Sequence, residues 1–215
     1  MSGFNLDPHA SDSSIHYFID DDGIFENAVK LLAGMDRGAS AAIYSALKRA
    51  TSSGAMLAQK EIRQSYVLSA ATFKAYTKAR RHYVTDASGT TAEIEFAGVH
   101  IPLAKFDTAV DNSGRVKARV KRGNARETLD HAFSANVGKY GHVGIFERVG
   151  EARMPIKELV GPSVPQMISY NEDLSQSIGD QIFEKFKERL DHEILAVLNG
   201  WNIGRGGGLA KHWGA

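Results

Sequence analysis

The feature that most constrains the fold is an apolar stripe near the C-terminal end of the chain. Large apolar side chains recur there every three or four residues, and charged residues lie between them. This spacing predicts one amphipathic helix over residues 171–199, and Gly200 is a typical helix stop. Such a helix is on the order of 40 Å long, more than a small sheet needs as cover, so part of its stripe is available to a neighbouring subunit.

Three shorter helical patterns precede this one. Apolar residues at helical spacing predict a short helix over residues 24–32, followed by Gly34 as a stop. An Ala-rich pattern over residues 42–62 predicts a longer helix, with a break expected near residues 52–54, where serine and glycine cluster.

The third pattern begins at Ser69, a typical N-cap. It predicts a helix over residues 70–78. The bases Lys78, Arg80 and Arg81 stand at its end, where cations interact favourably with the helix dipole.

The apolar spacing changes from helical to alternating in the middle of the chain. Residues 92–96 alternate apolar with acidic side chains, and residues 116–121 alternate apolar with basic ones. This period of two indicates half-buried strands, and residues 133–137 and 143–149 are predicted to form two more. The proline-rich residues 155–165 are expected to run over the surface or along a neighbour.

These patterns together predict an α+β fold. A small, mainly antiparallel sheet of four or five strands is expected to pack with the N-terminal helices and the long C-terminal helix. We divide the chain into an acidic flexible arm (1–22), a single α+β domain (23–200) and a glycine-rich C-terminal tail (201–215).

Charge is segregated along a chain whose formal net charge is only +1. Residues 1–36 hold seven acids and one base, whereas residues 37–81 hold nine bases and one acid. A second basic block, residues 115–126, holds six Lys or Arg and no acid. Such segregation allows a basic face toward an anionic partner, and it equally allows the chain to pair its own halves.

The first basic segment has two open interpretations. Its candidate residues are Lys48, Arg49, Lys60, Arg63, Lys74, Lys78, Arg80 and Arg81. They form either a DNA-facing surface, because DNA affinity comes mainly from neutralised phosphates, or a solvated or subunit-facing surface.

The second basic block also has two interpretations. If the two alternating strands are neighbours, Glu93 and Glu95 face Lys117 and Arg119, and each cross-strand pair contributes about 0.2–1 kcal/mol. Otherwise the block is free to bind an anion.

Composition and motifs mainly exclude functions. The chain has no cysteine, which excludes a disulfide framework, a thiolate zinc site and a cysteine nucleophile. The eight histidines show no ligand-like spacing, and no P-loop, dinucleotide fingerprint or Gly-x-Ser-x-Gly elbow occurs. We therefore expect no cofactor, no metal and no enzymatic activity, and the lack of long apolar runs predicts no membrane partner.

One segment is distinctive as a string. Residues 141–167 read GHVGIFERVGEARMPIKELVGPSVPQM. This segment strongly resembles the C-terminal signature of the minor tail protein Z family of tailed bacteriophages, in which F-x-R-x-G leads to R-x-P-I-x-E-L-x-G-P-S-x-P-Q-M. The positions that carry the resemblance are Phe146, Arg148, Gly150, Arg153, Pro155, Glu158, Gly161, Pro162, Ser163, Pro165 and Gln166. The order of the upstream elements extends the resemblance over residues 37–199, but not to the acidic arm or the glycine-rich end.

The resemblance implies a structural protein of the virion. Its members act at the head-proximal end of the tail, in tail completion, head–tail joining and positioning of the DNA end. The implied partners are copies of itself in a ring, a hexamer by the usual symmetry of tails, the tail terminator and other tail or neck proteins, and viral DNA in the tail channel. Assembly in the host cytoplasm is implied, and catalysis is not.

Within the signature, the prolines restrict the backbone and so lower the entropy cost of docking. Arg148 and Arg153 are expected to hold the proline loop through its carbonyls or through Glu158. An alternative from another class is a soluble nucleic-acid-binding module that uses the basic helices of residues 37–81, and steeply salt-dependent DNA binding by the free subunit would favour it.

Overall fold

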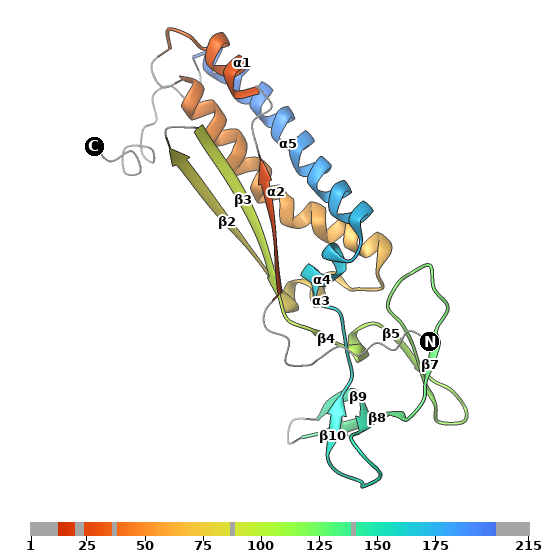
Figure 1. The fold of residues 1–215 in the computed structure, drawn as a ribbon. Coiled ribbons are helices and arrows are strands. Elements are labelled where there is room, and N and C mark those ends of the chain that lie inside the picture. The colour runs from red at the N-terminus through yellow and green to blue at the C-terminus, as the bar shows by residue number, and fades with distance from the viewer. Residues whose placement is uncertain (1–12, 20–23, 36–37, 87–88, 139–140, 201–215) are drawn as a thin grey trace. The chain divides into compact units, whose positions relative to one another are not determined.

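The computed structural model describes residues 13–19, 24–35, 38–86, 89–138 and 141–200 (Figure 1). Part of the predicted acidic arm, Ser13–Ile19, forms strand β1. The rest of that arm up to residue 22 and the glycine-rich end 201–215 lie outside the described residues.

The chain divides into two compact units. The first contains residues 1–16, 56–80 and 95–178, and the second contains residues 17–55, 81–94 and 179–215. Two long helices and three strands each continue from one unit into the other. The single domain over residues 23–200 stays a prediction.

Five α-helices are formed by the described residues. They are α1 (Ile24–Leu31), α2 (Gly38–Ser65), α3 (Ala70–Tyr76), α4 (Val164–Ser169) and α5 (Glu172–Leu198). The predicted short first helix and the long C-terminal helix are confirmed as α1 and α5. Gly200 follows α5 with a φ of 76°, a left-handed conformation that suits glycine after a helix.

Helix α2 continues through residues 52–54, so the expected break is wrong. The Ser52 and Ser53 hydroxyls donate to carbonyl oxygens four residues earlier, at 2.8 and 3.2 Å, and therefore bond within the helix instead of ending it. Gly54 is required by close packing: a Cβ there would lie 2.5 Å from Ile94 Cδ1.

Helix α3 begins where the sequence predicts. The Ser69 hydroxyl accepts a hydrogen bond from the Thr72 backbone N–H at 3.0 Å, which confirms the N-cap. The helix ends at Tyr76, however, and Lys78, Arg80 and Arg81 lie on strand β2 (Thr77–Asp86). These three bases therefore do not extend a basic helical face.

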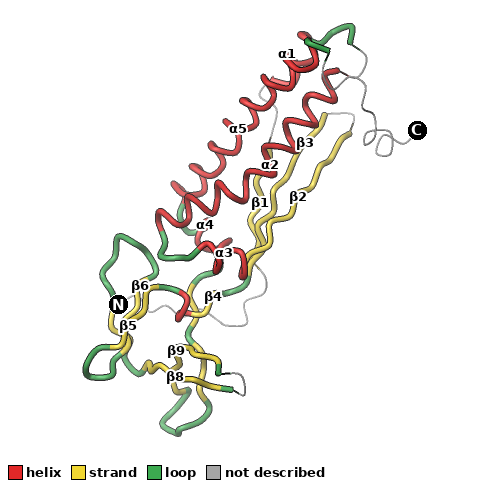
Figure 2. The backbone as a smooth tube through the Cα atoms, turned by 180° about the vertical axis from the view of Figure 1, so that it is seen from behind, coloured by secondary structure: helices red, strands yellow, loops and turns green. Residues whose placement is uncertain are grey.

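The strands form several small antiparallel sheets. Three sheets have three strands each: β1–β3–β2 with β3 (Gly89–Gly98), β5–β6–β7 (Asp107–Val110, Val116–Arg119, Glu127–Leu129), and β8–β9–β10 (Ala132–Val137, His142–Arg148, Ile156–Glu158). Strand β4 (Ile101–Pro102) leads into a 3₁₀ helix, η1 (Leu103–Lys105), and pairs with β11 (Val160–Gly161). The α+β class is confirmed, with its strands divided among these sheets (Figure 2).

Helices α2 and α5 run antiparallel, side by side (Figure 2). In the second unit, a Cβ at Gly38 would lie 3.1 Å from Val197 Cγ1, so the start of α2 is close to the end of α5. In the first unit, Ser177 Oγ donates to Glu61 Oε2 at 3.3 Å. Among the described residues, no helix has the length and apolar character that crossing a membrane requires.

The predicted pairing of Glu93 and Glu95 with Lys117 and Arg119 is wrong. Strands β3 and β6 belong to different sheets, so these side chains are not cross-strand neighbours. On its own sheet, Glu95 lies 3.4 Å from Arg80 Nη1 on β2.

Acids of the adjacent strand neutralise β6 instead. Asp107 stands opposite Arg119 in the β5–β6 register, and their side chains are 2.7 Å apart. Arg126 Nη2 lies 2.6 Å from the other Asp107 oxygen. The Arg126 hydrogen bond, with further help from Arg119, holds the pKa of the Asp107 carboxyl below its usual range.

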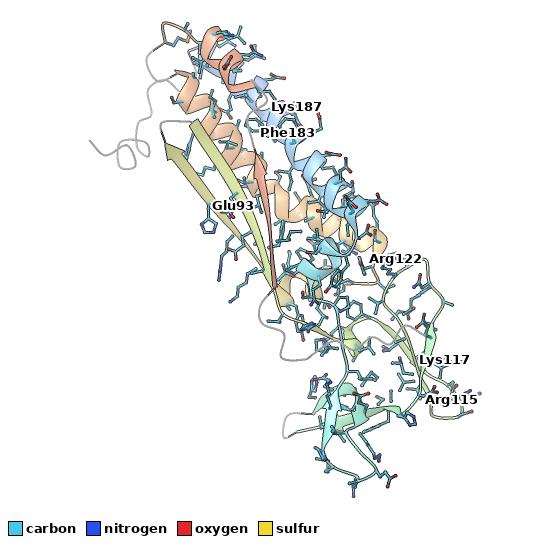
Figure 3. The ribbon with its side chains drawn as sticks, viewed as in Figure 1. Glu93, Arg115, Lys117, Arg122, Phe183 and Lys187 are labelled. Atoms are coloured by element: carbon cyan, nitrogen blue, oxygen red, sulfur yellow. The ribbon has the colours of Figure 1, made fainter. Side chains whose placement is uncertain are left out.

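Asp111 neutralises the other end of the same hairpin. Its Oδ2 accepts from Arg115 Nε at 3.2 Å and lies 3.7 Å from Lys117 Nζ, and Figure 3 shows both bases on this hairpin. Acids of its own hairpin, Asp107 and Asp111, therefore pair with the basic strand, in place of Glu93 and Glu95.

Candidate functional site

The signature segment forms the β9–β10 strands and the path into α4. Phe146 is buried on β9, opposite Phe133 on β8 and Glu158 on β10. Gly144 gives the Glu158 side chain room, because a Cβ there would lie 2.7 Å from Glu158 Oε1. That oxygen lies 2.7 Å from His142 Nε2, so a side-chain contact joins strands β9 and β10.

The expected role of Arg148 and Arg153 is wrong. The partner of Glu158 is His142, and the Arg148 guanidinium lies 5.1 Å from the centroid of the Phe133 ring. Both arginines are exposed, in the loop or at its edge. Backbone closes the loop instead: Val149 N–H donates to Pro155 O at 3.1 Å. Gly150 lies in this loop, and a Cβ built there would have no neighbouring atom within 4 Å.

The segment after the loop enters the core. Residues 155–165 were expected to run over the surface, but Gly161, Ser163, Val164 and Pro165 are buried. Gly161 is buried because strand β11 pairs with β4, where Gly161 stands opposite Ile101.

Two glycines allow this close approach. A Cβ at Gly161 would lie 2.6 Å from Phe106 Cε2. A Cβ at Gly98 would lie 3.1 Å from Pro165 Cδ and 2.9 Å from a backbone oxygen. Pro162, between the buried positions, is half-buried.

Helix α4 begins with a capping box. The Ser163 N–H donates to Gln166 Oε1 at 3.0 Å, and the Gln166 N–H donates to Ser163 Oγ at 3.4 Å. The helix is anchored by the Tyr66 hydroxyl, which donates to Met167 O at 3.2 Å. Burial raises the pKa of Tyr66, so this donor stays protonated over a wide pH range.

The candidate basic residues are divided between the two units. Lys60, Lys74 and Lys78 are exposed. Arg63 Nε donates to Leu68 O at 3.2 Å, and Arg80 pairs with Glu95, so these two arginines have local structural partners.

The other three candidates gather in the second unit. Lys48 and Arg49 line a hollow of about 440 Å³ together with Ser45, Ser52, Ser53 and Arg189. Arg81 Nη1 donates to Ser52 Oγ at 2.8 Å and so joins its rim. Side chains from α2, α5 and β2 therefore converge there.

Arg189 was missed as a candidate, because the charges around it on α5 have mixed signs. Only the pairing of α2 with α5 identifies it. Arg49 is fixed in this hollow by Glu193, whose Oε1 lies 3.0 Å from Arg49 Nε; the Glu193 side chain is only 2% exposed, against 52% for Arg49.

A second hollow, of about 240 Å³, lies between α1 and α5. It is lined mainly by apolar residues of the two helices, with Lys187 at its border. The Lys187 ammonium lies 5.0 Å from the Phe183 ring centroid on the same helix (Figure 3).

Within the described ranges, no group of three or more His, Asp or Glu side chains is placed to hold a metal ion. Comparisons of the chain with protein-family models, with curated proteins and with solved structures found no match.

Proposed function

We propose that this chain is a structural subunit of a phage tail that acts at the head-proximal end, in tail completion and head–tail joining. The observation that carries the proposal is the string of residues 141–167, which resembles the signature of the minor tail protein Z family position by position. The proposed role requires no catalysis, no metal and no cofactor.

The packing of the signature supports an assembly role. Close contacts at Gly144 and Gly161, buried Pro165 and the capping box of Ser163 hold the chain in one conformation. A segment fixed in this way loses little conformational entropy when a partner docks on it, which favours association.

The same segment exposes apolar side chains at its loop. Val149 and Met154 are each 64% exposed, directly beside the backbone hydrogen bond that closes the loop. Exposed apolar side chains on an ordered loop suit contact with another subunit.

The proposed neighbours are copies of the chain in a closed ring, with six copies matching the symmetry of tails, and the tail terminator and other tail or neck proteins. In this role the protein resides in the virion after assembly in the host cytoplasm, and it helps to position the DNA end in the tail channel.

The double variant Val149→Asp, Met154→Asp tests the assembly role. We expect it to melt as the wild type does but to reduce the joining of heads to tails in a complementation assay by at least about tenfold, because charge is excluded from a tight interface core. Val110→Asp, on strand β5 and 54% exposed, is the matched control and should complement normally. Normal head–tail joining with the double variant would remove the loop from the assembly surface.

A further inference from the structure

We propose that the hollow between α2 and α5 binds a phosphate group, either free phosphate or a phosphodiester of a nucleic acid backbone. This inference goes beyond the assembly role and does not rest on it. It follows from the side chains that line one hollow in the second unit.

The α2 side of the hollow is a polar stripe at helical spacing. Ser45, Lys48, Arg49, Ser52 and Ser53 stand at positions i, i+3, i+4, i+7 and i+8, so they share one helix face. No acidic residue occurs on this helix before Glu61, and the stripe therefore carries positive charge only. This makes the α2 wall a surface of cations and hydroxyls.

Two other elements contribute further cations to the hollow. Arg189 reaches the hollow from α5, and Arg81 reaches its rim from β2, where it donates to Ser52 Oγ at 2.8 Å. Planar guanidinium groups with several N–H donors match the oxygens of a phosphate. A convergence of cations from three elements differs from the isolated exposed lysines elsewhere on the predicted basic surface.

The acids near the hollow leave most of this charge uncompensated. Glu193 is buried and is paired with Arg49 at 3.0 Å. Glu188, the acid beside Arg189 in the sequence, accepts a hydrogen bond from Lys185 at 2.6 Å; this bond, and to a lesser extent the charge of Arg189, lowers the pKa of Glu188. Lys48 has no ion-pair partner among the described residues.

The hydroxyls add adaptable donors. Ser52 and Ser53 donate to carbonyl oxygens of their own helix. Rotation of each hydroxyl about its side-chain bond can redirect the proton to a ligand. The Ser45 hydroxyl has no hydrogen-bond partner among the residues that the structure describes, so it is free to donate.

The double variant Lys48→Gln, Arg189→Gln tests the site in the full-length chain. It removes two cations but keeps Arg49, whose loss would disturb buried Glu193. Lys60→Gln, Lys74→Gln is the matched control, since both lysines are exposed and the change in net charge is the same. Thermal melting of both variants establishes that each is folded.

Binding is measured with two probes. A DNA duplex of about 20 base pairs is titrated at roughly 50 and 200 mM salt, and we expect affinity to fall steeply between them. The site variant should bind about tenfold or more weakly and lower the salt slope by about 2, whereas the control should bind within about twofold of the wild type. In the second measurement, inorganic phosphate is added to the protein, and chloride at equal ionic strength is the control. We expect phosphate to change the NMR chemical shifts of residues near Ser45, Lys48 and Ser52.

The outcomes distinguish the sources of phosphate. Duplex binding that depends on Lys48 and Arg189 supports a nucleic acid backbone, and a response to inorganic phosphate alone that depends on them supports free phosphate. Absence of both responses, or equal losses in the site variant and the control, would overturn the site. Neither of these negative results bears on head–tail joining, so the two proposals fail separately.

Discussion

Replacing Gly161 by alanine is the sharpest test of how the signature segment packs. The new Cβ would lie 2.6 Å from Phe106 Cε2 and 3.0 Å from Cζ, about 1 Å inside ordinary carbon–carbon contact. Phe106 is only 7% exposed, and its rigid ring has to move as a whole. Overpacking of this kind costs about 1–3 kcal/mol. The smaller entropy of the unfolded alanine chain offsets about 0.4–1 kcal/mol.

We therefore expect Gly161→Ala to lower the free energy of unfolding by about 1–2 kcal/mol, or the melting temperature by roughly 2–8 °C. Gly150→Ala is the matched control in the same signature, because nothing lies within 4 Å of a Cβ built there. Its free energy of unfolding should be unchanged or slightly higher. Urea unfolding followed by circular dichroism measures both. Equal stability of Gly161→Ala and wild type, or equal losses in the two variants, would refute the packing described for Phe106.

Three further variants test single contacts. Ser163→Ala removes the N-cap of α4 and should cost about 0.5–2 kcal/mol in urea unfolding, and an unchanged midpoint would contradict the capping box. Arg49→Gln deprives buried Glu193 of its ion pair and should cost about 1–3 kcal/mol, whereas the exposed neighbour Lys48→Gln should stay within about 0.5 kcal/mol of wild type; equal effects would argue against the pair. Asp107→Asn should lower the melting temperature at neutral pH. The pKa of Asp107 is lower in the folded protein than in the unfolded chain. The stability that the Asp107 carboxylate contributes is therefore present above the unfolded pKa and is lost as pH falls through the folded pKa. The difference in melting temperature between Asp107→Asn and wild type should narrow below about pH 4. A difference that persists undiminished at pH 2 would contradict this linkage.

Local patterns predicted the helices well where the signal was itself local. The apolar stripe of α5 and the N-cap at Ser69 depend on residues within a few turns, and both are confirmed. The prediction of a break in α2 was wrong because the cause of its glycine is not local. Glycine at position 54 has a tertiary cause, the approach of Ile94, which a rule based on neighbouring residues does not contain.

Which strands pair with one another depends on contacts between residues distant in sequence, and these were not predicted. Alternation identified β3 and β6 as strands, but charge complementarity alone does not fix sheet membership, and Asp107 rather than Glu93 faces Arg119. The same limit applies to the basic hollow. Lys48 was recognisable from the acid-free helix, whereas Arg189 became part of the site only through the pairing of α2 and α5.

The proposed role as a structural subunit of a tail is tested most directly in purified virions. Immunolabelling and electron microscopy of the tails locate the chain, and the mass of the released assembly gives its copy number. We expect a closed ring of copies at the head-proximal end. A stable monomer inside intact particles would contradict the ring, and absence of the chain from particles would contradict the proposed role.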